Sequence, residues 1–264
     1  MPYEENQNIE KLGNGASKDW LRTRQPEFYP ALIVIDMQNG FCTQGGSYDK
    51  FGGDFSKYRG IIPKIREVIN ICHGLHVPVF FTEQIREASG IDLLSRLHRI
   101  IPRERLEFIE GPPPTCVRGT WDAATIDELK PTVEDHICQK RRDSAFQDTD
   151  LQLWLKSLGI DTLIFTGIDT CICVENSFRE AFNKGYDIIL IEDATASVWE
   201  DLHQATLRKA RNSFGLVMDT EHLIQLLQTS QIIPAPSNGP AAFSFEQLIS
   251  LLFSSKNDCT EYTE

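Results

Sequence analysis

The feature that most constrains the fold is an alternation between short apolar runs and longer amphipathic stretches. The apolar runs have the length of strands and cover 31–36, 77–82, 135–140, 162–167, 187–192 and 215–219. Four of them are almost continuously hydrophobic, as strands covered on both faces are. Helical spacing of apolar residues marks 58–75, 150–158, 173–184 and 202–214. The pattern predicts a three-layer α/β/α fold, with a mostly parallel six-stranded sheet and helices on both of its faces.

The chain is expected to divide into one domain with an extension at each end. We predict an N-terminal extension over 1–29, a single α/β domain over 30–228, and a linker followed by a tail over 229–264. Residues 243–253 are apolar enough to form a short helix that must dock, either on this domain or on a neighbouring subunit. Gly111 and the prolines that follow it break the helical periodicity, so 111–121 is expected to form a loop.

The charge balance argues against several kinds of partner. The chain has 26 Lys and Arg against 38 Asp and Glu, so its net charge is −12. Phosphate backbones and anionic lipid surfaces are repelled on average, and we expect neither nucleic acid nor a membrane as a partner. No apolar run approaches the roughly 20 residues of a membrane-spanning helix, and the polar N-terminus lacks the features of a secretory signal. A cytoplasmic location is therefore expected.

Three chemically active side chains come at or just after the ends of predicted strands. Asp36 ends the first strand, Lys140 ends the third, and Cys173 begins the helix that follows the fourth. In a doubly wound sheet these positions converge beyond the carboxyl ends of the strands. A cysteine at a helix N-terminus beside an ammonium group has its thiolate favoured, and a nearby carboxylate can act as its base. The sequence therefore predicts nucleophilic catalysis, although each residue taken singly could be purely structural.

The remaining cysteines and the histidines have simpler interpretations. The seven cysteines are an odd number in mostly apolar surroundings, which suits reduced thiols. Cys171 and Cys173 could form half of a metal clip or a redox pair, but no second Cys or His pair lies near them. The six histidines share no spacing, and we assign none of them a catalytic role. The other cysteines are interpreted as small core residues: Cys42, Cys72, Cys116, Cys138 and Cys259.

Over about 30–227 the sequence resembles the isochorismatase-like cysteine hydrolases. The resemblance rests on three motifs in this order: ALIVIDMQNGF (31–41), KRRDSAF (140–146) and TGIDTCICVENSFREAF (166–182). It implies an isochorismatase-like fold and an Asp-Lys-Cys triad formed by Asp36, Lys140 and Cys173. It also implies a cis peptide just before Asp169, which aims the backbone N–H groups of Asp169 and Cys173 at the substrate oxygen as an oxyanion hole.

Within that family the chain is most similar to the ureidoacrylate and biuret branch, because GTWD (119–122) and DEL (127–129) precede the lysine strand. It departs from that branch at Asp143, where ureidoacrylate enzymes tend to carry Tyr, and at EQIR (83–86), where they carry Asn-Gly-Trp. Nicotinamidases add a metal whose ligands include histidines after the first strand, and 40–64 holds none. No metal and no cofactor are therefore expected. The isochorismate-cleaving branch lacks the cysteine, so Cys173 favours amide chemistry.

Six further side chains are predicted to contact the substrate. Arg86 could hold a substrate carboxylate through two parallel hydrogen bonds, or form a surface salt bridge instead. Trp121 and Phe146 could form walls of the substrate site or belong to the core or an interface. The complete set of predicted substrate-binding residues is Phe41, Gln84, Arg86, Trp121, Asp143 and Phe146.

The resulting prediction is a cofactor-free, cysteine-dependent amidohydrolase. We expect it to cleave a C–N bond of a small linear carbamoyl or ureido compound, biuret-like or ureidoacrylate-like, through a covalent thioester, and to release ammonia or carbamate. Hydrolysis of another small amide (maleamate, N-carbamoylsarcosine or nicotinamide) and a non-catalytic binding protein on the same fold are the alternatives. Similar hydrolases form dimers or tetramers, so a homo-oligomer is expected, with the apolar tail contributing to it.

Overall fold

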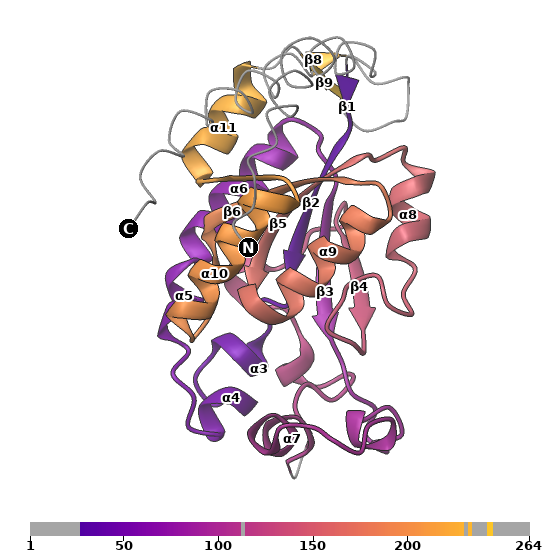
Figure 1. The fold of residues 1–264 in the computed structure, drawn as a ribbon, viewed down its shortest axis with the longest axis vertical. Coiled ribbons are helices and arrows are strands. Elements are labelled where there is room, and N and C mark those ends of the chain that lie inside the picture. The colour runs from indigo at the N-terminus through magenta and orange to yellow at the C-terminus, as the bar shows by residue number, and fades with distance from the viewer. Residues whose placement is uncertain (1–26, 112–113, 230–231, 234–241, 245–264) are drawn as a thin grey trace, which may run out of the picture.

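Six parallel strands form the central sheet, in the order β4-β3-β2-β5-β6-β7 (Figure 1). The computed structural model describes residues 27–111, 114–229, 232–233 and 242–244. All six predicted strands are present, and the predicted fold class is confirmed. Their bounds are Pro30–Ile35 (β2), Val79–Gln84 (β3), His136–Lys140 (β4), Thr162–Ile168 (β5), Asp187–Ala196 (β6) and Leu216–Met218 (β7).

Helices cover both faces of this sheet (Figure 1). Buried residues of α6 and α11 belong to the core on one face, and those of α8, α9 and α10 belong to the core on the other. The predicted helix over 58–75 is divided in two, because Pro63 lacks an N–H group and starts a new helix. The helices on the two faces of the sheet, with α5 leading into α6, are Ser56–Gly60 (α5), Ile62–Gly74 (α6), Leu151–Ser157 (α8), Glu175–Asn183 (α9), Glu200–Ser213 (α10) and Thr220–Thr229 (α11).

Strand β2 lies at the centre of the sheet and is buried on both faces. Leu32 and Val34 pack into one core, and Ile33 and Ile35 pack into the other. Beside it, Gly167 of β5 has a φ of +101°, and a Cβ atom at this position would come 2.1 Å from the Ile35 carbonyl oxygen. Only glycine fits this close approach of the two strands at the edge where the predicted site residues emerge.

Three short helices lie beyond the carboxyl ends of the strands, at the bottom of Figure 1. They are Asn39–Cys42 (α3), Ser47–Lys50 (α4) and Arg103–Glu110 (α7). None of them was predicted from the sequence, because α3 and α4 have only four residues each and α7 buries only Ile109, so none shows a clear apolar face. Within the described ranges, no helix has both the length and the apolar character that crossing a lipid bilayer requires.

A small antiparallel sheet joins segments from the two ends of the chain, with the order β1-β9-β8. Its strands are Glu27–Phe28 (β1), Ala242–Ser244 (β9) and Ile232–Ile233 (β8). The helix predicted over 243–253 is wrong at its start, because Phe243 lies in a strand and pairs with Phe28. Their rings are 5.5 Å apart and buried in the core of the same chain. The rest of that predicted helix, like Cys259, lies outside the described residues.

Candidate active site

A cavity of about 500 Å³ opens at the carboxyl edge of the sheet. Asp36, which follows β2, and Cys173, which follows β5, lie on its wall together with Asp169. Lys140, the last residue of β4, contacts Asp36 from behind that wall. The convergence predicted from strand ends is therefore present in the structure, because parallel strands deliver their carboxyl ends to one edge of the sheet.

Asp36 is held in an uncommon backbone conformation by the neighbouring strand. Its φ is +50°, in the left-handed region that aspartate tolerates better than most residues. Its backbone N–H donates to Thr82 Oγ1 at 3.1 Å, and the Thr82 hydroxyl donates to Asp36 Oδ1 at 2.6 Å. Thr82 belongs to β3, so adjacent strands fix both the turn of the chain and the orientation of the carboxylate.

Lys140 is completely buried and keeps its charge through four oxygen contacts. Its Nζ lies 2.8 Å from Asp36 Oδ2 and donates hydrogen bonds to Gln84 Oε1 at 2.8 Å and to the carbonyls of Arg142 and Asp143, each at 3.0 Å. Burial opposes the charge, but the Asp36 carboxylate and Cys173 outweigh it and raise the pKa of Lys140. Lys140 and Asp36 therefore form a buried ion pair.

Cys173 lies in a π-helical turn, Thr170–Val174 (η4), which continues directly into α9. Helical structure therefore begins three residues earlier than predicted, and Cys173 is in its first turn. Burial raises the pKa of the Cys173 thiol well above its ordinary value, Lys140 opposes this shift, and the Asp36 carboxylate adds to it by its charge and by a hydrogen bond. This outcome differs from the predicted favoured thiolate, because burial and Asp36 outweigh the lysine.

The turn before Cys173 is held by Asp169. The expected cis peptide is present between Ile168 and Asp169. The Asp169 carboxylate accepts hydrogen bonds from the Tyr58 hydroxyl at 2.8 Å, from the Cys171 backbone N–H at 3.0 Å and from the Ser197 hydroxyl at 3.1 Å. The Asp169 carbonyl oxygen accepts hydrogen bonds from the backbone N–H groups of Ile172 and Val174, the residues before and after Cys173. These bonds fix the backbone that was predicted to form the oxyanion hole.

Four of the six predicted substrate-binding residues line the cavity, namely Phe41, Gln84, Arg86 and Asp143. Trp121 and Phe146 are not among its lining residues, and these two predictions are corrected. Trp121 begins a short 3₁₀ helix and is 52% exposed to solvent. Phe146 is buried in the core beneath the loop after β4, 5.9 Å from the Tyr186 ring.

Several residues of the cavity wall were missed by the sequence reasoning. Tyr58 was taken as the start of a predicted helix, although its hydroxyl reaches Asp169. The others come from short helices and irregular segments that carry no periodic signal. They are Tyr48, Phe51, Arg105, Phe108, Ile109 and Trp199.

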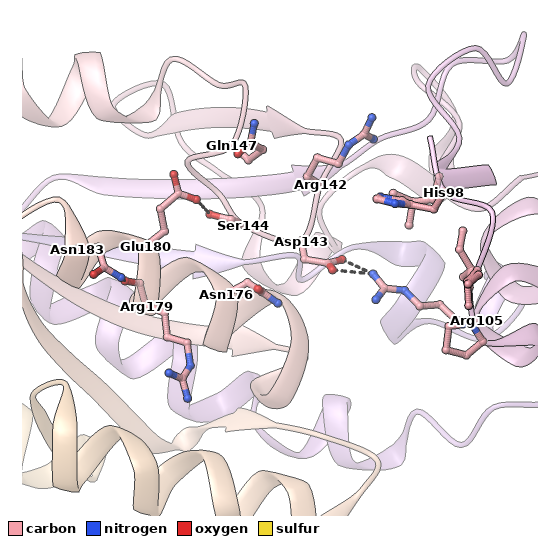
Figure 2. A pocket seen from close by; sticks show the side chains of 14 residues that line it. His98, Arg105, Arg142, Asp143, Ser144, Gln147, Asn176, Arg179, Glu180 and Asn183 are labelled. Atoms are coloured by element: carbon pink, nitrogen blue, oxygen red, sulfur yellow. Dashed lines mark hydrogen bonds and ion pairs between the residues drawn. The ribbon is translucent and has the colours of Figure 1, made fainter. Parts of the chain in front are cut away.

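A second hollow of about 690 Å³ adjoins the cavity and is drawn in Figure 2. Pro102, Arg105 and Asp143 line both hollows. In Figure 2 the Arg105 guanidinium and the Asp143 carboxylate point at each other, with Nη2 at 2.6 and 2.7 Å from the two carboxylate oxygens. This ion pair therefore forms part of the wall between the outer hollow and the catalytic cavity. Within the ranges that the structure describes, no group of three His, Cys, Asp or Glu side chains could hold a metal ion.

Comparison with known proteins gives consistent matches. A family model described as the isochorismatase domain matches 30–222. A ureidoacrylate amidohydrolase of Yersinia enterocolitica is 35% identical over 206 residues, which cover 74% of this chain and 88% of that protein. One of Acinetobacter baylyi is 30% identical over 209 residues, which cover 76% of this chain and 84% of that protein. These matches confirm the resemblance drawn from the three motifs.

The solved structures that resemble this chain have the same architecture. An isochorismatase-like hydrolase from Alkaliphilus metalliredigens aligns with a TM-score of 0.61 at 29% sequence identity, covering 74% of this chain and 97% of that one. The range that the family model matches, 30–222, contains the six-stranded sheet and carries Asp36, Lys140 and Cys173.

Proposed function

Because this chain belongs to the isochorismatase family, we propose that it is a cysteine-dependent amidohydrolase acting on a small linear carbamoyl or ureido compound. It is a hydrolase of carbon–nitrogen bonds other than peptide bonds, as its amidohydrolase relatives are. The observation that supports the cysteine mechanism is the convergence of three residues at one edge of the sheet: Asp36 and Cys173 lie on the cavity wall, and Lys140 Nζ lies 2.8 Å from Asp36 Oδ2.

In the resting site the thiol carries its proton and Asp36 does not. The raised pKa of Cys173 supports the protonated thiol, and the ammonium group 2.8 Å away supports the ionised Asp36. Asp36 Oδ2 takes the thiol proton as the sulfur attacks the substrate carbonyl carbon. One C–S bond forms, the carbonyl π bond breaks, and the oxygen becomes an oxyanion.

The backbone N–H groups of Asp169 and Cys173 hold the oxyanion in this proposal. Their orientation depends on the Asp169 side chain, which is held by Tyr58 and Ser197. Donors that are fixed before the reaction need no reorganisation as charge develops on the oxygen, and loss of one such donor typically costs about a hundredfold to a thousandfold in turnover.

The tetrahedral intermediate collapses when its C–N bond breaks. Asp36 gives the proton to the departing nitrogen, so ammonia or an amine leaves and a thioester remains on Cys173. Water then adds to the thioester carbon, with Asp36 again accepting a proton, and breakage of the C–S bond returns the thiol and releases the acid. Lys140 stays charged throughout and keeps Asp36 oriented through the contacts it makes with Gln84 and the 142–143 carbonyls.

An ammonia-release screen across biuret, ureidoacrylate, N-carbamoyl amino acids, maleamate and nicotinamide tests the proposal. We expect release from at least one carbamoyl or ureido compound, abolished in Cys173→Ser and retained in Cys171→Ala, which changes a neighbouring thiol outside the cavity wall. Release from nicotinamide alone would overturn the branch assignment. A folded protein that releases ammonia from none of these compounds would favour the binding-protein alternative.

A further inference from the structure

Arg86 is a buried cation on the cavity wall. It follows β3, its residue is 6% exposed, and one guanidinium nitrogen donates to the Ile85 carbonyl at 3.0 Å. Within the described part of the chain no carboxylate forms an ion pair with it, whereas Arg118 and Arg141 both pair with Glu87 on the outside. Burial lowers the pKa of Arg86, so the fold bears a cost for keeping this charge out of water. An anionic group arriving in the cavity would offset that cost.

The carboxylates of the cavity wall are already engaged. Asp36 contacts Lys140, Asp143 is held by Arg105, and Asp169 accepts from Tyr58 and Ser197. Glu104 also lines the cavity but is exposed to solvent. Arg86 is thus the charged group of this wall that a ligand could neutralise without displacing an existing partner. Its planar fork of N–H donors fits a carboxylate through two parallel hydrogen bonds.

A second part of the cavity is aromatic. The Phe108 ring, on α7, lies 6.2 Å from that of Phe41, 5.4 Å from that of Tyr48 and 5.4 Å from that of Phe51. We call these four residues the aromatic wall. Such spacings are typical of favourable ring contacts, and another ring or a branched apolar group packs well against them. The aromatic wall belongs to the same cavity as Arg86 and Cys173.

The size of the cavity exceeds what a bare ureido compound needs. A cavity of about 500 Å³ lies within the range of about 300–1,000 Å³ that holds drug-sized ligands. A ureido group attached to a short acid fills only a small part of it. A substrate that leaves the aromatic wall in contact with water would gain nothing from its apolar surface.

We infer that the substrate is a ureido acid that carries an aromatic or branched apolar group, with its carboxylate on Arg86 and its apolar group on the aromatic wall. This inference rests on the proposed function, because the ureido carbon must meet Cys173. Arg86 and Phe108 are then specificity-determining residues that leave the chemistry of the triad unchanged.

Three probes separate the two contacts. N-carbamoylphenylalanine has both the carboxylate and the ring, N-carbamoylglycine lacks the ring, and 2-phenylethylurea lacks the carboxylate. We expect kcat/KM for Cys173-dependent ammonia release from N-carbamoylphenylalanine to exceed that for each of the other two by at least about tenfold, since a charge-assisted hydrogen bond and the burial of a ring each contribute that much or more.

Matched variants assign each preference to its residue. Arg86→Gln should lower kcat/KM for the two acids by about 10-fold to 100-fold more than for 2-phenylethylurea, whereas Arg118→Gln, at a half-exposed arginine, should change none of the three. Phe108→Ala should lower kcat/KM for the two phenyl compounds more than for N-carbamoylglycine. The control for ring removal is Phe182→Ala, at an exposed ring that packs on Phe214.

Inhibition of the wild-type protein provides a test that does not depend on folding of a variant. 3-Phenylpropanoate should inhibit hydrolysis at least about tenfold more strongly than 3-phenylpropanol or acetate. Equal kcat/KM for N-carbamoylphenylalanine and N-carbamoylglycine would overturn the aromatic contact. Equal kcat/KM for N-carbamoylphenylalanine and 2-phenylethylurea would overturn the Arg86 contact. If none of the three is cleaved while biuret is, the inference fails and the proposed function stands. If hydrolysis of every substrate proceeds without Cys173, the proposed function itself fails.

Discussion

Replacing Asp36 by Asn should make the Cys173 thiol more reactive while it abolishes turnover. In the structure the negative charge of Asp36 raises the pKa of the Cys173 thiol, and the positive charge of Lys140 lowers it. Asp36→Asn removes the first charge and leaves Lys140 in position, because its nitrogen still donates to Gln84 and to two backbone carbonyls. One charge within a few ångströms shifts a pKa by about one to three units. The thiolate fraction at neutral pH should therefore rise by about 10-fold to 1,000-fold.

The assay is the pH dependence of iodoacetamide alkylation, followed by mass spectrometry of the peptide that contains both Cys171 and Cys173. Alkylation of Cys173 should accelerate in Asp36→Asn, and its titration should shift to lower pH. Over the same range kcat/KM should fall at least about a thousandfold, because no base remains to take the thiol proton or to return it to the leaving nitrogen.

Cys171 is the internal control for this experiment. Burial raises the pKa of its thiol to about 12, and the charged group that adds to the shift is Asp169 rather than Asp36. Its slow alkylation should therefore be the same in wild type and variant. Lys140→Met should act in the opposite direction on Cys173, since it removes the charge that favours the thiolate. Unchanged or slower alkylation of Cys173 in Asp36→Asn would refute the electrostatic reasoning.

Four further outcomes are expected. Cys173→Ser should lose at least about a thousandfold in turnover and Cys171→Ala far less, as measured by ammonia release, and equal losses would contradict the choice of nucleophile. The double variant of Asp36→Asn and Lys140→Ala should lose much less activity than the product of the single losses, and multiplicative losses would mean that the two residues do not act as a unit. Chelator-treated protein should keep its activity, and a loss restored by added metal would refute the expectation of a metal-free site. Phe243→Ala should lower the free energy of unfolding by about 3–5 kcal/mol in denaturant titrations, because its ring packs on Phe28 of the same chain, while light scattering should still give the mass of a dimer or tetramer.

Strand positions could be predicted because a strand that is buried on both faces has a nearly continuous hydrophobic sequence. In β2, Leu32 and Ile33 face different cores, so polar residues are excluded from consecutive positions. Helix α11 had a usable signal that was overlooked, since Leu223, Leu226 and Leu227 recur at helical spacing. Helix α7 had almost none, because Ile109 is its single buried residue. The sequence contains the sheet and its main helices far more clearly than the short helices around the cavity.

In the candidate site, too, some residues could be predicted from the sequence and others could not. Asp36, Lys140 and Cys173 could be located from sequence because topology alone brings strand ends together. The walls could not, since Phe108 and Tyr48 reach the cavity from α7 and α4, whose placement depends on loops. For Trp121 and Phe146 the sequence showed an aromatic residue near a motif but not the direction of its ring. In the structure the Trp121 side chain is largely exposed, and the Phe146 ring packs in the core against Tyr186.

The arrangement around Lys140 accounts for how the proposed site could hold a base beside a protonated thiol. Lys140 Nζ lies 2.8 Å from Asp36 Oδ2, so the ammonium favours an ionised carboxylate, and that carboxylate in turn opposes ionisation of the Cys173 thiol and raises its pKa. Gln84 Oε1 and the carbonyls of Arg142 and Asp143 accept hydrogen bonds from the same Lys140 nitrogen. Gln84 therefore matters to the proposed chemistry although it carries no charge, because it helps to hold the lysine beside Asp36.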